Sequence, residues 1–108
     1  MPGLFDPITI NGLTLKNRVV MPPMATHLAN EAGEVAEKHI RHYAARARAS
    51  VGLIIVEQTC VHRSGRAGET QLGIDDDALI PGLRRLAEAI RSGGAASCIQ
   101  LNHTGSKT

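Results

Sequence analysis

The feature that most constrains the fold is a short apolar segment, residues 51–56, that lies between two helical patterns. Its sequence, Val-Gly-Leu-Ile-Ile-Val, has no polar position, so both faces of such a strand need to be covered. Strands of this kind belong to parallel sheets that are packed against helices. A third strand is expected at 96–101, after the second helical pattern. Strands and helices that alternate in this way predict right-handed crossovers and a parallel α/β fold.

Helical periodicity marks the two segments between these strands. The first helix is expected to begin at about Glu34, and the second follows an acidic N-terminal signal at 75–77. Pro81 falls in the first turn of the second helix, where its ring is tolerated, and Gly93-Gly94 ends that helix. The apolar faces are Ala36, Ile40, Tyr43, Ala44 and Ala47 in the first helix, and Leu79, Leu83, Leu86, Ala87 and Ile90 in the second.

The N-terminal segment predicts a β-hairpin. Two alternating runs, 8–10 and 13–15, flank Asn11-Gly12, a pair that tolerates the positive φ angles of a tight hairpin turn. A short strand is then expected at 18–21, and Pro22-Pro23 ends it because proline donates no hydrogen bond to a sheet. The remaining polar stretches, 25–33 and 62–73, are expected to be loops.

Composition excludes several classes of function. The 12 Lys and Arg residues and 10 Asp and Glu residues leave a net charge of only +2, and aromatic residues make up 2% of the chain, so a nucleic-acid partner is not expected. The longest apolar run is far shorter than the ~20 residues of a membrane span. No signal-peptide pattern is visible, and the two cysteines lack CxxC spacing, so we expect no membrane partner and a cytoplasmic location.

Length sets the domain organisation. The chain of 108 residues is much shorter than the ~250 residues of a complete (β/α)₈ barrel. It also stops just after the third strand, without a helix to cover it. Such a strand would leave an open edge. We therefore expect residues 1–108 to be the incomplete N-terminal portion of a larger barrel, with self-association through that edge as a further expectation.

Polar residues follow each expected strand of the parallel sheet. They form three clusters, at residues 22–24, 57–59 and 100–103. Because parallel α/β folds build their sites at the carboxyl ends of strands, the three clusters are expected to meet at one rim.

Four segments taken together resemble one known family. Residues 4–8, 15–24, 51–57 and 100–105 are similar in order and spacing to the old yellow enzymes, which are FMN-dependent NAD(P)H:flavin oxidoreductases on a TIM barrel. Residues 33–35 and 74–83 resemble most closely the branch of 2,4-dienoyl-CoA reductases and enoate reductases.

The resemblance implies a fold and a chemistry. The fold would be the first three β/α units of a TIM barrel with an N-terminal hairpin, and the whole protein would reduce activated C=C bonds of a small enone or enoyl substrate. FMN would be the cofactor and NADH or NADPH the reductant. The family's catalytic residues lie downstream of this length, as would an iron–sulfur cluster and FAD in a C-terminal extension, so no catalytic residue is expected within this chain.

The resemblance also implies particular site residues. Backbone from the segment after the first barrel strand would lie against the flavin, and two carboxamides would bond its polar edge. Two positions depart from the family: Ala25 replaces a usual Cys or Thr, and Ser106 follows His103-Thr104-Gly105 where Arg is usual. The implied cofactor-binding residues are Pro22, Pro23, Met24, Ala25, Gln58 and Gln100, and the implied substrate-binding residues are His27 and His103.

Other conspicuous side chains are interpreted as structural. Glu57 is expected to bond nearby backbone or arginine rather than to act in catalysis. His39 and His42 share a helix face, but a closed zinc site needs two more ligands, so a solvated face is expected and no metal site. Cys60 and Cys98 are expected to pack as small apolar residues.

Two other interpretations fit the same sequence. One is a non-catalytic truncated barrel that folds only by association with another chain. The other is a different TIM-barrel flavoprotein, such as a relative of dihydroorotate dehydrogenase, for which the expected catalytic Cys or Ser with Lys is not found.

Overall fold

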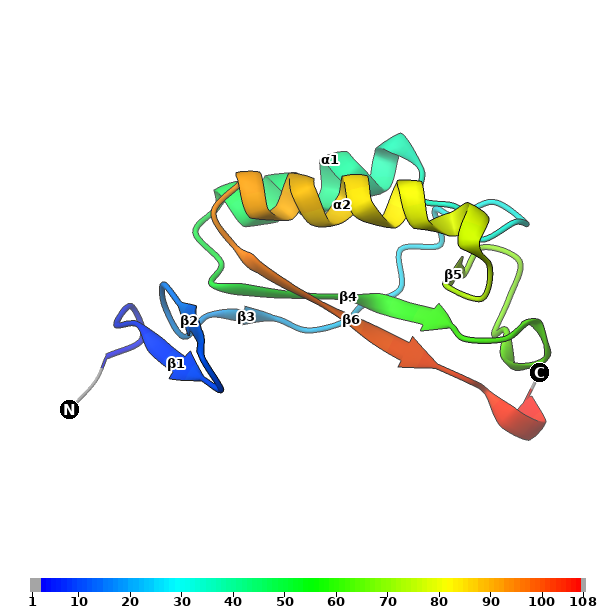
Figure 1. Ribbon diagram of the computed structural model, residues 1–108, viewed down its shortest axis with the longest axis horizontal. Helices are drawn as coiled ribbons and strands as arrows, with labels where there is room; N and C mark the ends of the chain where they lie inside the picture. The colour runs from blue at the N-terminus through cyan, green and yellow to red at the C-terminus, as the bar shows by residue number, and fades with distance from the viewer. Residues whose placement is uncertain (1–2, 108) are drawn as a thin grey trace.

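A parallel sheet with both helices on one side forms the body of the computed structural model, which describes residues 3–107 (Figure 1). The central strand β4 (Leu53–Cys60) pairs with β3 (Val20–Met21) and with β6 (Ala96–Asn102). A two-residue strand, β5 (Leu72–Gly73), pairs with the end of β4. All of these pairings are parallel, so the carboxyl ends of the strands lie at one edge, as the alternating pattern predicted.

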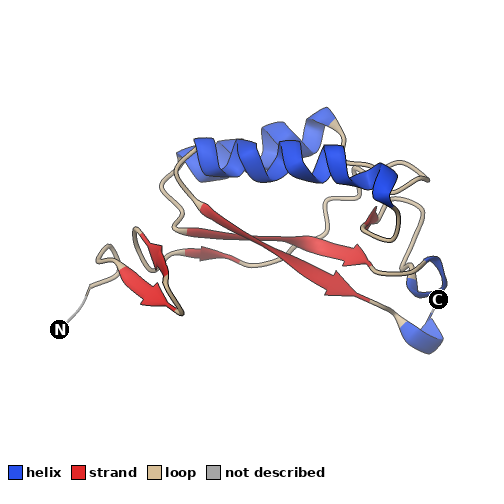
Figure 2. Cartoon of the chain, viewed as in Figure 1, coloured by secondary structure: helices blue, strands red, loops and turns tan. Residues whose placement is uncertain are grey.

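Helices α1 (Glu37–Arg48) and α2 (Ile80–Ser92) connect these strands and pack side by side on the sheet (Figure 2). The core lies between the two layers, because the helices and β4 each contribute fully buried side chains to one cluster. The largest of these apolar side chains are Tyr43 of α1, Ile54 of β4, and Leu86 and Ile90 of α2. Burial of this one face is what fixes the helices over the sheet.

The N-terminal hairpin forms as predicted, with β1 (Ile8–Ile10) antiparallel to β2 (Leu13–Leu15). Asn11 has a φ of 47° and Gly12 a φ of 85°, the positive values that a two-residue hairpin turn of the primed type requires. The hairpin lies at the end of the sheet opposite the carboxyl edge (Figure 1). It therefore takes no part in the rim where the polar clusters gather.

Several predicted boundaries were wrong. Helix α1 begins at Glu37 rather than at Glu34, because Glu34 closes a turn in which its N–H donates to Asn30 Oδ1 at 3.1 Å. Strand β4 continues beyond Val56 to Cys60, because pairing with β6 carries it through the polar residues. β5 falls within a segment expected to be loop throughout.

Neither α1 nor α2 is long and apolar enough to cross a membrane, and the same holds for every other helix among residues 3–107.

Candidate functional site

A β-bulge brings the two predicted cofactor-binding carboxamides together at the carboxyl edge. The register pairs Val56 with Ile99 and Thr59 with Leu101, so Glu57 and Gln58 of β4 face the single residue Gln100 of β6. Bulges re-aim side chains and are frequent beside functional sites. Without the extra residue, Gln58 would follow Val56 onto the face beneath the helices. The bulge instead buries Glu57 there and leaves Gln58 half-buried and Gln100 exposed.

These two carboxamides lack partners within the protein. Neither side chain makes a hydrogen bond to any residue in the described part of the chain. Each carboxamide offers two donor hydrogens and an acceptor oxygen. A pair of unpaired amides at one rim can therefore bond a ligand that has alternating donors and acceptors along one edge.

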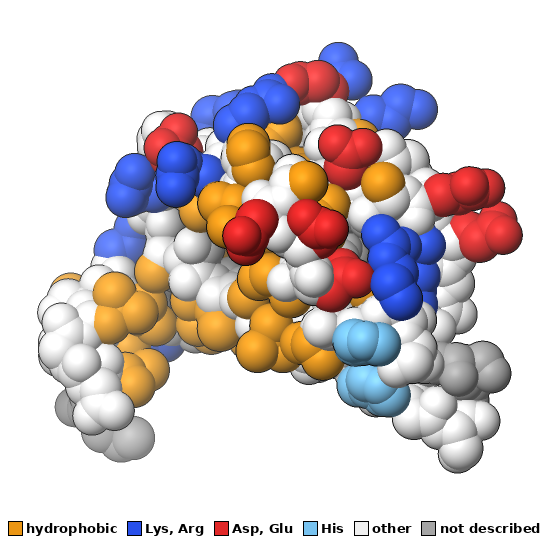
Figure 3. Space-filling model, turned by 45° about the vertical axis from the view of Figure 1, so that its right-hand side comes forward, with side chains coloured by type: hydrophobic (Ala, Val, Ile, Leu, Met, Phe, Trp, Pro, Cys, Tyr) orange, Lys and Arg blue, Asp and Glu red, His pale blue; other side chains and the backbone are white. Residues whose placement is uncertain are grey.

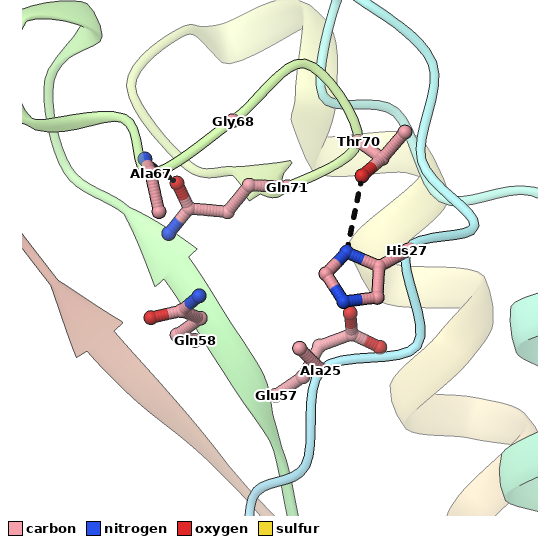
Figure 4. Close-up of a pocket in the computed structure, with 8 residues that line it drawn as sticks. All are labelled: Ala25, His27, Glu57, Gln58, Ala67, Gly68, Thr70 and Gln71. Atoms are coloured by element: carbon pink, nitrogen blue, oxygen red, sulfur yellow. Dashed lines mark hydrogen bonds between the residues drawn. The ribbon is translucent and has the colours of Figure 1, made fainter. Parts of the chain in front are cut away.

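A small cavity of about 70 Å³ lies beside Gln58 (Figure 4). Ala25, His27 and Glu57 line one side of it, and Gln71 with the loop around Gly68 lines the other. The His27 ring reaches across the cavity to Thr70, with Nδ1 3.3 Å from Thr70 Oγ1. Pockets for whole cofactors are several times larger. This cavity alone is therefore too small to hold a whole cofactor.

Residues 22–25, which follow β3, lie beside two separate cavities. Ala25 lines the small cavity and also a second depression of about 440 Å³, which Met21, Met24 and His42 share. Met24 is 63% exposed, so its side chain presents apolar surface to solvent rather than to the core. Pro22 is exposed and Pro23 half-buried at the same edge of the sheet.

His103 is held against a neighbouring turn and does not line the small cavity. Its ring packs so closely on Gly65 that a Cβ there would overlap it. Nδ1 of the ring accepts the N–H of Gly105 at 3.0 Å, and Nε2 lies 3.3 Å from Ser64 Oγ. The contacts tie the end of β6 to the turn that follows β4.

Glu57 is structural in its contacts, as predicted, and its carboxylate is almost fully buried beneath the rim. Oε2 accepts the N–H of Thr26 at 3.1 Å, and Oε1 accepts the hydroxyls of Thr26 at 2.8 Å and Tyr43 at 2.9 Å. Tyr43 in turn accepts the backbone N–H of Glu57 at 3.1 Å. Burial raises the pKa of Tyr43 above its usual value, so the phenol keeps the proton that it donates. Of the two expected kinds of partner, backbone or arginine, the described residues provide the backbone, through the N–H of Thr26.

The expectation of a solvated histidine pair was wrong for His39, whose side chain is fully buried, while His42 is half-buried. Burial is possible because Nδ1 accepts the N–H of Ala36 at 2.8 Å, which caps α1. The ring proton therefore sits on Nε2, which lies 3.8 Å from Glu57 Oε1. No group of three or more potential metal ligands occurs among the described residues.

This burial predicts a pH dependence of stability. Burial lowers the pKa of His39 below its usual 6.5. As pH falls past 6.5, His39 therefore takes up a proton in the unfolded chain before it does so in the folded chain. The free energy of unfolding is expected to decrease between about pH 7.5 and pH 5.5. His39→Gln keeps a capping side chain that does not titrate, and urea unfolding should show a shallower slope. The slope will not vanish, because burial also lowers the pKa of His42. Identical slopes would contradict the assignment.

The two cysteines differ. Cys60 is buried as expected, and burial raises the pKa of its thiol. Cys98, expected to pack in the same way, is exposed on β6, where it lines the open depression between β6 and α2. Both cysteines are free.

Sequence reasoning missed the residues of the loop that closes the cavity. Gln71 is buried, accepts the N–H of Ala67 at 2.5 Å, and donates to Asn102 Oδ1 of β6 at 3.2 Å. Arg63 and Arg66 donate to backbone carbonyls of the facing loop, at Asn30, Glu31 and Ala32. In the sequence these residues stand in a polar, glycine-rich stretch without periodicity. Their role in holding the loop in place is seen only from their hydrogen bonds to residues far away in the sequence.

Comparisons with known proteins agree with this geometry. The profile of the NADH:flavin oxidoreductase / NADH oxidase family matches residues 3–108. An NADH oxidase from Thermoanaerobacter brockii is 47% identical over 108 residues, which are 99% of this chain and 17% of that protein. The solved old yellow enzyme homologue from Zymomonas mobilis is 34% identical with a TM-score of 0.86, covering 94% of this chain and 28% of that one. Morphinone reductase in complex with tetrahydroNAD is 33% identical with a TM-score of 0.88, and the match covers 100% of this chain and 29% of that one.

The fold and the site define a segment of a TIM barrel, in which a four-stranded parallel sheet and two helices place polar groups at the carboxyl edge. The chain belongs to the NADH:flavin oxidoreductase / NADH oxidase family, the family of the old yellow enzymes. It spans about a sixth of the length of the matching NADH oxidase and less than a third of the two solved chains.

The residues present fit the flavin that the family implies. Gln58 and Gln100 are free to bond the polar edge of a flat heterocycle, and the exposed Met24 can cover apolar ring surface. Ala25 has no side-chain donor, so only the backbone can hydrogen-bond a ligand at that position.

Proposed function

We propose that this chain forms one wall of the FMN site of an oxidoreductase that uses NADH or NADPH to reduce activated C=C bonds. The observation that carries the proposal is the bulge that places Gln58 and Gln100 together, unpaired, at the carboxyl edge. The chemistry fits the family and the names of the relatives, an NADH oxidase and a morphinone reductase bound to tetrahydroNAD.

Each residue has a defined task in this proposal. FMN, when bound, supplies the hydride chemistry, and the protein binds and orients it. Pro22, Pro23, Met24 and Ala25 provide a stiff backbone wall with little conformational freedom to lose on binding. Gln58 and Gln100 bond the polar edge of the ring. No residue of this chain is assigned a catalytic proton transfer.

The substrate is proposed to be a small enone or enoyl compound on the His27 side of the site. His27 lines the small cavity and already bonds a hydroxyl, which shows that its ring can present a donor or acceptor there. The resemblance also assigns His103 to the substrate side, but His103 does not line this cavity, so we propose that it acts through its contacts with Gly65 and Ser64, which would fix the neighbouring loop.

The whole protein is proposed to be a complete barrel, of which residues 1–108 are the N-terminal portion. The support is the coverage of the relatives, 17% of the NADH oxidase and 28% of the old yellow enzyme homologue. An iron–sulfur cluster or FAD would have to be held by an extension downstream of these residues. Free thiols at Cys60 and Cys98 fit a reducing compartment such as the cytoplasm.

A titration of the natural protein that carries residues 1–108 with FMN, followed by flavin fluorescence, tests the proposal. We expect saturable binding, and Gln100→Leu should raise Kd by about 5- to 150-fold, because an amide contact that becomes buried under the flavin is worth ~1–3 kcal/mol. Ser97→Ala, on the same strand, is the control and should leave Kd unchanged. Absence of saturable binding would overturn the proposal, and an unchanged Kd in Gln100→Leu would remove Gln100 from the site.

An apolar groove favours a second candidate role, that of a non-catalytic chain that folds by association. Between α2 and β6 lies an open depression of about 260 Å³, and Figure 3 shows apolar side chains gathered on this side of the molecule. The free edge of β6 adjoins it, with Leu101 61% exposed. A chain of this kind would bind no FMN in the same titration.

A further inference from the structure

We propose that Glu57 is a positioning residue, which acts through Thr26 to hold the backbone of Ala25–His27 in a strained turn facing the cavity. The inference rests on the proposed function only for its consequence, since Ala25 and His27 are assigned to the cofactor and substrate sides of the site. The turn itself is a property of the chain without any ligand.

The strain lies at His27. Its φ is 58°, in the left-handed region that is costly for a residue with a Cβ. Such a conformation persists only where the surroundings fix it, and it is concentrated at functional sites. The described chain fixes this turn at two points, Thr26 to Glu57 and the His27 ring to Thr70.

The Glu57 contact is the stronger of the two. It consists of two hydrogen bonds from one residue, the N–H and the hydroxyl of Thr26, to one buried carboxylate. The His27 contact is a single longer interaction on an exposed residue. Bonds to a charged acceptor are roughly twice as strong as neutral ones. Glu57 therefore contributes most of what offsets the strain.

Glu57 is itself held in place by Tyr43 of α1. Tyr43 donates to Oε1 and accepts the N–H of Glu57, so the same phenol holds the carboxylate and its backbone. The Thr26 N–H, the Thr26 hydroxyl and the Tyr43 hydroxyl all donate to the carboxylate, and an ionised carboxylate can only accept hydrogen bonds. Ala25 and His27 flank the clamped residue, and both line the cavity together with Glu57 (Figure 4). Fixing Thr26 thus fixes the direction of both neighbours.

The test measures the turn without FMN, in the natural protein that carries residues 1–108. Hydrogen exchange of the residue 26 amide and the ³J(HN–Hα) coupling of His27 are recorded by NMR. In Glu57→Ala, exchange at Thr26 should be at least ~10-fold faster relative to the Ile54 amide, and the coupling should move toward the value for extended backbone. Glu57→Gln can still accept the Thr26 N–H while its amide donates to the Thr26 hydroxyl, so it should restore exchange to within about threefold.

Thr26→Val provides the matched variant at the other end of the contact. It keeps the amide donor and the volume but loses the hydroxyl bond, so exchange at residue 26 should increase about threefold in a folded protein. This variant decides the matter if Glu57→Ala does not fold. An unchanged His27 coupling in folded Glu57→Ala, or unchanged exchange in Thr26→Val, would overturn the proposal.

FMN affinity separates the two claims. If the turn responds as expected but the protein binds no FMN, the proposed function fails and the positioning role stands. If FMN binds and Glu57→Ala leaves the turn unchanged, the positioning role fails alone.

Discussion

Replacing Tyr43 with phenylalanine is expected to lower the free energy of unfolding by about 2–5 kcal/mol. The phenol makes two buried hydrogen bonds, one to Glu57 Oε1 and one from the Glu57 N–H. Phenylalanine keeps the ring in the core but leaves the Glu57 N–H without its acceptor, and Oε1 of the buried carboxylate keeps only the Thr26 hydroxyl. A buried donor or acceptor that loses its partner costs ~1–3 kcal/mol, and more where a charged group is involved.

Thr9→Val is the matched control for this experiment. It also deletes one hydroxyl hydrogen bond, the 2.8 Å pair between Thr9 and Thr14, but this pair is exposed on the hairpin. Urea unfolding should show a change within about 0.5 kcal/mol for the control. Equal losses in Tyr43→Phe and Thr9→Val would mean that the Glu57 cluster is not the buried network described above.

Gly52→Ala is expected to destabilise the protein by about 3 kcal/mol, since a new methyl group in a filled site forces backbone shifts. A Cβ at Gly52 would overlap Asn17 Oδ1 and lie 2.6 Å from the Asn17 carbonyl oxygen. Asn17 cannot move aside easily. It is buried, donates to the Ser50 carbonyl at 2.6 Å, and accepts the Val19 N–H at 3.0 Å.

Gly68→Ala is the control for crowding. A Cβ at Gly68 meets nothing within 4 Å, and its φ is not positive, so alanine should be neutral or stabilising by up to ~1 kcal/mol. Denaturant midpoints of both variants are compared with the wild type. A loss below 1 kcal/mol in Gly52→Ala would show that the entry of the chain into β4 is looser than the structure indicates.

The parallel topology and the hairpin could be predicted because local patterns determine them. Asn11-Gly12 is a turn signal that depends on two residues alone, and the apolar run of β4 needs cover on both faces whatever surrounds it. The carboxyl ends of parallel strands then meet by geometry. This is why Gln58 and Gln100, more than forty positions apart, could be expected at one rim.

The bulge could not be predicted, since nothing in residues 53–60 shows where β4 shifts register against β6. Its position depends on long-range packing, in which Glu57 turns toward Tyr43 beneath the helices. The buried His39 is a similar case. Helical periodicity correctly placed Tyr43 and Ala47 on the core face. It did not predict that His39 is buried as well, which the bond from the Ala36 N–H to Nδ1 of the ring makes possible.

The central claim is that Gln58 and Gln100 together meet the flavin. NMR of the ¹⁵N-labelled side-chain amides during FMN titration of the natural protein tests it most directly. The NH₂ signals of Gln58 and Gln100 should shift saturably with one common Kd, and the signal of Gln71 should move less, because that amide already donates to Asn102. Shifts at Gln71 or in the groove between α2 and β6, with Gln58 and Gln100 unmoved, would contradict the account.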